Sequence, residues 1–346
     1  FWNSFSVSKN VIKKQLELKG TYTVLYSFGI FVITCVIGLL GNGIVIYITG
    51  FKMKQKSKIW FLNMAVADFL FLLWLPLDAT NTITGNWPFG SYACKLYHMC
   101  STFNMYTSIF IMAALNVDRA ISVAKPLWHH KFITRSVCYR TCACIWILTA
   151  LASLPAVFVS AVHTGGNQTV CSLLILGQDD QEYNSSVAKR NLFSYGAYCF
   201  IISVVVIGYF IPLCVILISN GVIVCQVWRS QATKTSKLYR ITVSVVLVYF
   251  ITWTPLIIAY IIFLIAISTM NILLVFKVSA FMVLLNSIAY TNSCLNPIMY
   301  VLIGKQARDV LAASIKSLTN TSTQGRMSKH AENTDKLTLS STRTNK

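Results

Sequence analysis

Ionisable side chains are rare inside the long apolar segments of this chain, and those that occur there are the first candidates for chemistry. Asp68 lies in the middle of the stretch LNMAVADFL. A carboxylate at the centre of a bilayer costs about 3 kcal/mol, so it should face a polar cavity. Neutral polar residues that could surround it are Asn104, Ser108, Asn292 and Asn296. This group suits a monovalent cation such as sodium, and a polar network that holds helices together is an equally good interpretation.

A second charged group, Asp118-Arg119, ends the apolar run that begins at Cys94. From Cys94 to Asp118 a helix would rise roughly 36 Å, enough to cross a bilayer core. An adjacent acid and base at a helix end can be a simple solvated pair, which stabilises by about 0–1 kcal/mol.

Three prolines lie inside apolar runs and predict local hinges. Pro212, Pro255 and Pro297 each remove a backbone hydrogen bond and kink the helix that contains them. Trp253 precedes Pro255 by two residues, and Tyr300 follows Pro297 by three. A hinge beside a bulky aromatic residue suits a two-state element, whereas static packing is the other interpretation.

The composition predicts an integral membrane protein. The chain is 55% hydrophobic and only 11% charged, with mean hydropathy +0.63, whereas soluble domains carry about 25% charged residues. The net charge of +19 does not indicate nucleic-acid binding, because the basic residues cluster in short loops beside apolar runs. No metal-ligand cluster, phosphate loop or catalytic constellation is visible, and no histidine receives a role. We therefore expect no enzyme activity.

Seven apolar runs are long enough to span a bilayer, and the fold class we expect is an all-α seven-transmembrane bundle. The loops after the first, third and fifth runs hold most of the loop lysines and arginines, which places the N-terminus outside and the C-terminus inside. The polar residues within run 93–125 predict that this helix is central. The runs are 21–49, 57–83, 93–125, 136–161, 192–228, 236–266 and 272–302.

The remaining segments complete the organisation of the chain. Residues 1–20 are an extracellular N-terminal segment and 21–302 form the bundle. Residues 303–318 predict a short amphipathic helix on the cytoplasmic membrane surface. Residues 319–346 are rich in Ser and Thr, lack apolar periodicity and are expected to be disordered. This composition fits a phosphorylated tail and equally a bland polar terminus.

Two cysteines and two sequons mark the extracellular side. Nine of the eleven cysteines fall in or at the ends of apolar runs, where Cys behaves as a small hydrophobe. Cys94 and Cys171 should both lie at the extracellular face, so we pair them as a disulfide. Asn167 and Asn184 begin glycosylation sequons in the same long loop.

The ordered motifs along residues 21–316 resemble those of the rhodopsin-like (class A) G-protein-coupled receptors. Jointly they are highly specific, although each alone is weak. They are Gly41-Asn42, LNMAVAD with Asp68, Cys94, Asp118-Arg119, Trp146, Pro212, Thr252-Trp253-Thr254-Pro255, and Asn296-Pro297 with Tyr300.

The resemblance implies a receptor that transmits ligand binding to a heterotrimeric G protein. Asp68 and its four polar neighbours would hold a sodium ion as an allosteric ligand, with no other cofactor. Trp253 would sense ligand at the pocket floor. Arg119, Pro297 and Tyr300 would rearrange as the sixth helix moves outward, and the G protein would contact Arg119 and Leu127. Arrestin would bind the phosphorylated tail.

Within that family the chain is most similar to the chemoattractant group, which comprises formyl-peptide, chemerin-type and complement anaphylatoxin receptors. The evidence is Trp87-Pro-Phe-Gly before Cys94-Lys95, the stretch DRAISVAKPLW, and NSCLNPIMYVLIGKQAR. This implies a plasma-membrane receptor for a peptide or lipid mediator, coupled to an inhibitory G protein. Candidate ligand contacts are Ser101, Thr102 and Trp253, together with Lys95, Lys189, Arg190 and Lys277, which could receive an acidic group or simply be solvated.

Two departures from the family pattern support an alternative function. Ala120 replaces the usual tyrosine of Asp-Arg-Tyr, and Asn220 stands where the family commonly has a tyrosine that meets the rearranged arginine. A scavenger or decoy receptor that binds ligand without G-protein coupling is therefore the second hypothesis. An amine receptor is disfavoured because Ser101 occupies the level of the amine-binding acid. A retinal protein lacks a mid-span lysine, and no inverted repeat indicates a transporter.

Overall fold

The chain folds into a bundle of long helices. The computed structural model describes residues 2–53, 56–165, 168–173, 196, 198–229, 237–269 and 271–303. Within these ranges seven helices are long and apolar enough to cross a membrane, which confirms the predicted seven-helix bundle. These candidate spans are Thr21–Lys52, Lys58–Thr84, Gly90–Ala124, Arg135–Val159, Tyr198–Gln226, Val246–Ser268 and Leu273–Pro297.

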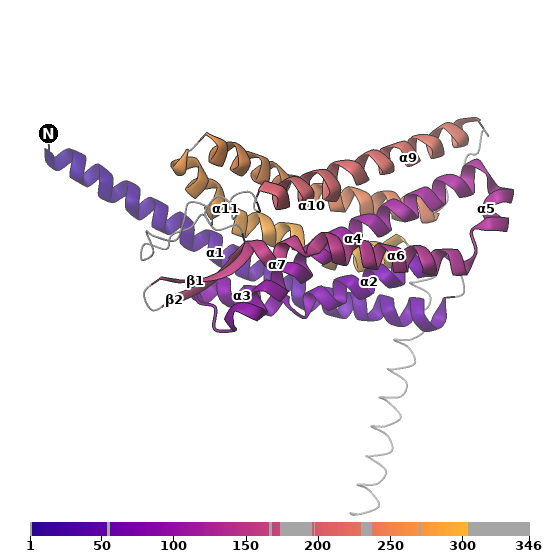
Figure 1. Ribbon diagram of the computed structural model, residues 1–346, viewed down its shortest axis with the longest axis horizontal. Coiled ribbons are helices and arrows are strands. Elements are labelled where there is room, and N and C mark those ends of the chain that lie inside the picture. Colours follow the sequence, from indigo (N-terminus) through magenta and orange to yellow (C-terminus); the bar gives the residue numbers. More distant parts are fainter. Residues whose placement is uncertain are drawn as a thin grey trace, which may run out of the picture.

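The chain begins with a helix that is longer than the predicted first span. Helix α1 (Trp2–Tyr47) continues into a short π-helical segment, η1 (Ile48–Lys52). No helix end marks the predicted boundary between residues 20 and 21, and α1 projects beyond the rest of the bundle (Figure 1). The predicted amphipathic helix 303–318 and the tail 319–346 lie beyond the described residues, apart from Ile303 at the end of α12.

Helix α4 (Gly90–Ala124) is the central element, as its internal polar residues predict. It packs against α2 (Lys58–Leu72), α6 (Arg135–Ser153), α7 (Pro155–Val159), α9 (Ile211–Arg229) and α10 (Lys237–Ser268). Asn104, Thr107, Ser108 and Asn116 of α4 are buried, so their polar groups meet other helices rather than lipid. At the end of α4 the short helix α5 (Pro126–Phe132) leads toward α6 (Figure 1).

The second span is broken near its end, and the break leaves one backbone carbonyl without its helical hydrogen-bond donor. Helix α2 ends at Leu72, and α3 (Leu75–Thr84) begins one residue before Pro76. Pro76 has no N–H to donate to the carbonyl of Leu72. The Cys35 thiol of α1 approaches that oxygen at 3.6 Å instead.

A side chain of α10 likewise replaces the hydrogen bond that a second proline removes. Residues 198–205 are helical and continue through the π-helical segment η2 (Val206–Phe210) into α9. Pro212 of α9 cannot bond the carbonyl of Gly208. The Tyr249 hydroxyl donates to this oxygen at 3.1 Å, so α10 supplies the missing partner.

The last span is bent and held closely against α1. Helix α11 (Ile272–Tyr290) and α12 (Asn292–Ile303) are separated by a turn at Thr291. Pro297 leaves the carbonyl of Ser293 without its helical donor, and Asn42 Nδ2 donates to that oxygen at 2.8 Å. A Cβ at Gly41 would lie only 2.8 Å from Pro297 Cγ, so glycine permits this approach.

A two-stranded hairpin, which the sequence analysis did not predict, crosses one end of the bundle. Strand β1 (Ser160–Gly165) pairs antiparallel with β2 (Gln168–Leu173), and Val162 lies opposite Cys171. Cys171 forms the predicted disulfide with Cys94 of α4, with a Cα–Cα distance of 5.6 Å. The hairpin, α3 and the N-terminal part of α1 share one end of the molecule, and α5 lies at the other (Figure 1).

Replacing Cys171 with serine should lower the free energy of unfolding by about 2–4 kcal/mol, because the disulfide closes a long loop and fixes the hairpin on α4. Thermal unfolding of the purified full chain measures this loss. Cys144→Ala is the matched control, since Cys144 is free and exposed. Equal unfolding temperatures for the two variants would contradict the expectation.

Candidate functional site

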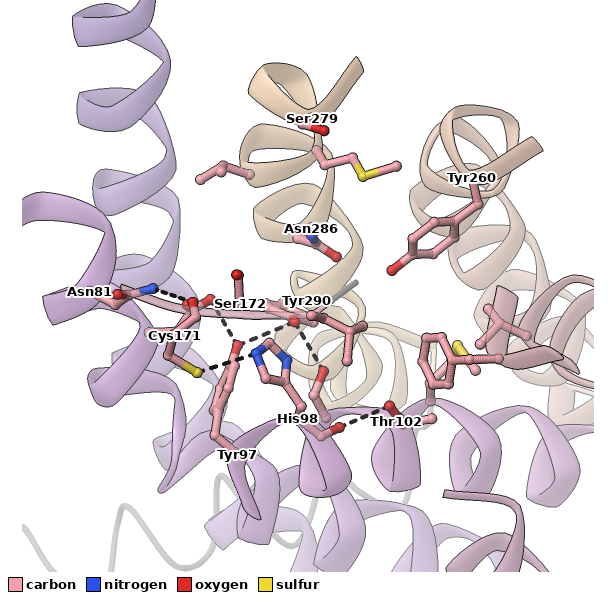
Figure 2. A pocket seen from close by; sticks show the side chains of 18 of the residues that line it. Asn81, Tyr97, His98, Thr102, Cys171, Ser172, Tyr260, Ser279, Asn286 and Tyr290 are labelled. Carbon is pink, nitrogen blue, oxygen red and sulfur yellow. Dashed lines mark hydrogen bonds between the residues drawn. The ribbon is translucent and has the colours of Figure 1, made fainter. Parts of the chain in front are cut away.

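A cavity of about 310 Å³ opens at the hairpin end of the bundle. Its walls come from α3, α4, β2, the helix at 198–205, α10 and α11. Tyr260 of α10 and Asn286 of α11 point into the same space, and Tyr290 lies beneath them (Figure 2). A volume of this size lies at the lower end of the range for small-molecule sites.

A chain of polar contacts crosses the cavity from α3 to α11. The Tyr97 hydroxyl donates to Asp78 Oδ2 at 2.8 Å and lies 3.2 Å from the Tyr290 hydroxyl. Ser101 Oγ donates to the same Tyr290 hydroxyl at 3.0 Å. These bonds fix the Tyr97 and Tyr290 side chains, so the polar wall of the cavity is preorganised.

The hairpin contributes the edge of the cavity beside the disulfide. His98 Nε2 lies 3.4 Å from Cys171 Sγ, and Asn81 donates to the Cys171 carbonyl at 3.1 Å (Figure 2). Cys94, His98 and Cys171 have the proximity of metal ligands. Because both sulfurs form the disulfide, they offer no thiolate to a metal. The sequence analysis gave His98 no role, although it lines the cavity.

The structure separates the predicted ligand contacts into two groups. Ser101, Thr102 and Trp253 line the cavity. Lys95 and Lys277 are not among its lining residues. Lys277 is exposed, and it lies about 200° around α11 from the cavity residue Ser279, two positions later. Lys189 and Arg190 lie outside the described residues.

The floor of the cavity is aromatic. Trp253 is 6% exposed and stacks on Tyr249 with ring centroids 5.8 Å apart. Its indole Nε1 is buried without a hydrogen-bond partner among the described residues. Pro255 follows two residues later inside α10. A bulky ring with an unsatisfied donor therefore stands directly beside a helix position that lacks one backbone hydrogen bond.

The buried acid Asp68 is surrounded by amides and hydroxyls from α4 and α12. Its Oδ1 accepts from Asn104 Nδ2 at 2.9 Å and from Ser108 Oγ at 3.4 Å. Its Oδ2 accepts from Asn296 Nδ2 at 2.9 Å. Asp68 is fully buried, and none of the ion pairs among the described residues involves it. Three of the predicted neighbours thus donate hydrogen bonds to this carboxylate, and no basic side chain in the described structure pairs with its negative charge.

The same cluster contains unused acceptors that suit a cation. The carboxamide oxygens of Asn292 and Asn296 are buried without partners in the described structure. Ser293, which the sequence analysis missed, donates to Asn104 Oδ1 at 3.2 Å. Asn292 itself shows no hydrogen bond to Asp68. Neutral oxygens beside a carboxylate are the ligand set that hard monovalent cations accept, so these residues fit sodium.

Near the other end of α4, two side chains rather than one contact Asp118. Arg119 Nη2 donates to Asp118 Oδ2 at 2.6 Å, and His129 Nε2 of α5 lies 2.8 Å from Asp118 Oδ1. The Asp118 side chain is only 7% exposed, so the pair is not freely solvated. His129 received no role from the sequence. No local sequence pattern predicts this contact, because it depends on how α5 packs against α4.

The other residues predicted to act at the Asp118-Arg119 end of the bundle take no part in this pair of contacts. Leu127 on α5 is 87% exposed and available to a partner. Ala120 is buried, and Asn220 Nδ2 donates to the Ile216 carbonyl of its own helix at 3.0 Å. The side chain of Tyr300 is outside the described structure, although its backbone belongs to α12. Asn167 and Asn184 also fall outside the described residues.

Comparison with known proteins gives one family throughout. The family model described as 7 transmembrane receptor (rhodopsin family) matches residues 41–300. N-formyl peptide receptor 3 of Homo sapiens is 33% identical over 346 residues, covering 97% of this chain and 96% of its own length. Its Pan troglodytes counterpart is 33% identical over 320 residues, covering 90% of each. Chemerin-like receptor 1 of Homo sapiens is 29% identical over 321 residues, covering 90% and 83%.

Replacing His129 with alanine should lower the free energy of unfolding by about 1–2 kcal/mol, because the largely buried Asp118 loses one hydrogen-bond donor. Thermal unfolding of the purified chain measures the change. The neighbouring His130 is exposed, so His130→Ala should leave the unfolding temperature nearly unchanged. A larger loss from His130→Ala than from His129→Ala would rule out this role for His129.

Proposed function

This chain belongs to the rhodopsin family of seven-transmembrane receptors and to its chemoattractant group, and we propose that it carries a chemoattractant signal across the plasma membrane to a heterotrimeric G protein. It is a receptor and not an enzyme. The ligand is a peptide or lipid mediator that enters the cavity from outside. The N-terminus and the hairpin are extracellular, and α5 faces the cytoplasm.

The observation that carries this proposal is the arrangement along α4. One helix lines the ligand cavity through Ser101 and Thr102 and carries Asp118-Arg119 near its other end. The buried Asp68 cluster binds the same helix between these points through Asn104 and Ser108. A ligand can therefore act on packed polar contacts that continue toward the cytoplasmic end.

The proposed mechanism uses the aromatic floor and the proline positions. A ligand in the cavity presses on Trp253, and α10 swings outward about Pro255. Rearrangement near Pro297 and Tyr300 accompanies this movement, and Arg119 leaves Asp118. The opened cleft receives an inhibitory-class G protein, which contacts Arg119 and the exposed Leu127. The phosphorylated tail then recruits arrestin.

Sodium has a separate part in this proposal. The ion would bind Asp68 with Asn104, Ser108, Asn292 and Asn296, and it would favour the inactive state. The support is chemical: within the described part of the chain, the fully buried Asp68 carboxylate has no basic partner, and two carboxamide oxygens nearby accept no hydrogen bond. In this site sodium would compensate the negative charge of Asp68 without adding a hydrogen-bond donor.

Asn220 and Ala120 support a second candidate function. Asn220 Oδ1 is buried and has no hydrogen-bond partner among the residues that the structure describes, and a carboxamide is too short to replace a tyrosine hydroxyl across a cleft. If the displaced Arg119 has no hydroxyl to receive it, the open state is poorly stabilised. The chain would then be a scavenger or decoy receptor that binds ligand without G-protein output.

Membranes that contain the full chain should catalyse ligand-dependent nucleotide exchange on an inhibitory G protein when a panel of chemoattractant peptides and lipids is applied. Arg119→Ala should reduce the exchange to the ligand-free level, while ligand binding persists because Arg119 is far from the cavity. No exchange with any panel member would favour the second function. In that case Ala120→Tyr together with Asn220→Tyr should create exchange, and failure to do so would reject the scavenger explanation for these residues.

Sodium chloride should raise the unfolding temperature of the purified chain relative to choline chloride at equal ionic strength. At ten times its dissociation constant the ion would stabilise the protein by about 1.4 kcal/mol. Asp68→Asn should abolish the difference, whereas Asp118→Asn should retain it because Asp118 lies outside the cluster. An equal sodium response in the wild type and Asp68→Asn would show that the ion binds elsewhere.

A further inference from the structure

The charge that the described cavity presents to a ligand is negative. Among the described residues that line it, Asp78 is the only carboxylate, and none is a lysine or an arginine. His98 is the other titratable group besides tyrosines, and one of its ring nitrogens lies against Cys171 Sγ. The lysines that the sequence suggested as receivers of an acidic ligand group, Lys95 and Lys277, are not part of this lining.

The carboxylate of Asp78 has bonding capacity left for a ligand. It accepts the Tyr97 hydroxyl at 2.8 Å, and it takes part in neither of the ion pairs found among the described residues. An ionised carboxylate offers about four lone-pair sites. Tyr97 holds Asp78 in place by a hydrogen bond, which leaves the negative charge itself uncompensated.

The cavity also has an apolar side. Met105, Phe200, Val204, Phe263 and Met282 line it, and three of the five come from the helix at 198–205 and from α10. Asp78 stands on α3, its hydroxyl partner Tyr97 on α4, and Tyr290, which contacts Tyr97, on α11. A ligand that fills the cavity must therefore satisfy a negative group at one wall and cover methionine, valine and aromatic carbons at another.

From this arrangement we propose that the ligand's buried charged group is a cation, an ammonium or guanidinium, joined to an apolar body, and that Asp78 pairs with it. This deepens the proposed receptor function by naming the chemistry of its ligand, and it rests on the cavity being the ligand site. An acidic group in the same place would meet a like charge in a partly buried site, which is unfavourable. The acid that selects the cation therefore stands on α3. Amine receptors instead carry their acid on the third span, where this chain has Ser101 on α4.

The test uses the purified full chain in nanodiscs of zwitterionic lipid and three pools of N-acetylated, C-amidated tetrapeptides. One position is arginine, its neutral analogue citrulline, or glutamate, and the other three positions vary among leucine, phenylalanine, methionine and valine. Peptides retained with the receptor are separated by size and counted by mass spectrometry. The wild type should retain the arginine pool about tenfold more than the citrulline pool, and the glutamate pool least.

Variants separate charge from hydrogen bonding at the same carboxylate. Asp78→Asn keeps an acceptor for Tyr97 and should equalise the arginine and citrulline pools. Asp78→Glu retains the charge and Tyr97→Phe removes only the hydroxyl, so both should keep the arginine preference. Asp78→Lys should transfer the preference to the glutamate pool, which gives a gain of binding that an unfolded variant cannot produce.

Equal retention of the three pools by the wild type, a preference for glutamate, or an arginine preference that survives in Asp78→Asn would overturn the proposal. The readout needs no G protein. An arginine preference without nucleotide exchange would therefore reject only the signalling function, and exchange evoked by acidic ligands that are insensitive to Asp78 would reject only the cationic class.

Discussion

Backbone and side-chain polar groups within a bilayer must find their partners inside the protein, and this requirement organises the whole bundle. Its clearest expression is at the prolines. Pro76, Pro212 and Pro297 each deprive a carbonyl of its helical donor, and a side chain of a different helix approaches each freed oxygen. Cys35 and Asn42 of α1 serve two of these carbonyls, and Tyr249 of α10 serves the third.

The same requirement places the ionised groups. Asp68 is tolerable at full burial because three donors from α4 and α12 converge on it. Asp118 lies at the end of the bundle, where Arg119 and His129 pair with it. Asp78 lines the cavity, where the Tyr97 hydroxyl donates to it and the Asn81 side chain also interacts with it. The three carboxylates thus differ in their surroundings, because only Asp118 has a basic neighbour among the described ion pairs and only Asp78 lines the cavity.

The sequence predicted the parts of this structure that depend on periodicity and length. Seven apolar runs, the central position of the third and the Cys94–Cys171 disulfide all follow from spacing and composition. The hairpin at 160–173 escaped prediction because the fourth apolar run was extended to residue 161 and the rest was treated as a loop, although Gly165-Gly166-Asn167 is a turn signal between two short runs rich in β-branched residues.

Side-chain direction was harder to predict than helix position. Lys95 and Lys277 were predicted as ligand contacts because they lie near the extracellular ends of spans, but neither lines the cavity. On α11 the cavity residue Ser279 and the exposed Lys277 lie on different faces of the helix. Asp78 was overlooked because a carboxylate near a span end is usually a solvated group. His129 and Ser293 gained partners only through contacts between α5 and α4 and between α12 and α4, which no local pattern encodes.

The turn at Thr291 gives the two polar regions a common mechanical element. The hydroxyl contacts that begin at Asp78 end on Tyr290, the last residue of α11, and the donors to the Asp68 cluster begin at Ser293 in the first turn of α12. If sodium binds the Asp68 cluster as proposed, an occupant of the cavity that alters the angle at this joint would also alter the affinity of that cluster for the ion. Thermodynamic reciprocity then requires the ion to change the occupant's affinity by the same factor, so dose–response curves for a ligand would shift with external salt composition even though the two sites share no residue.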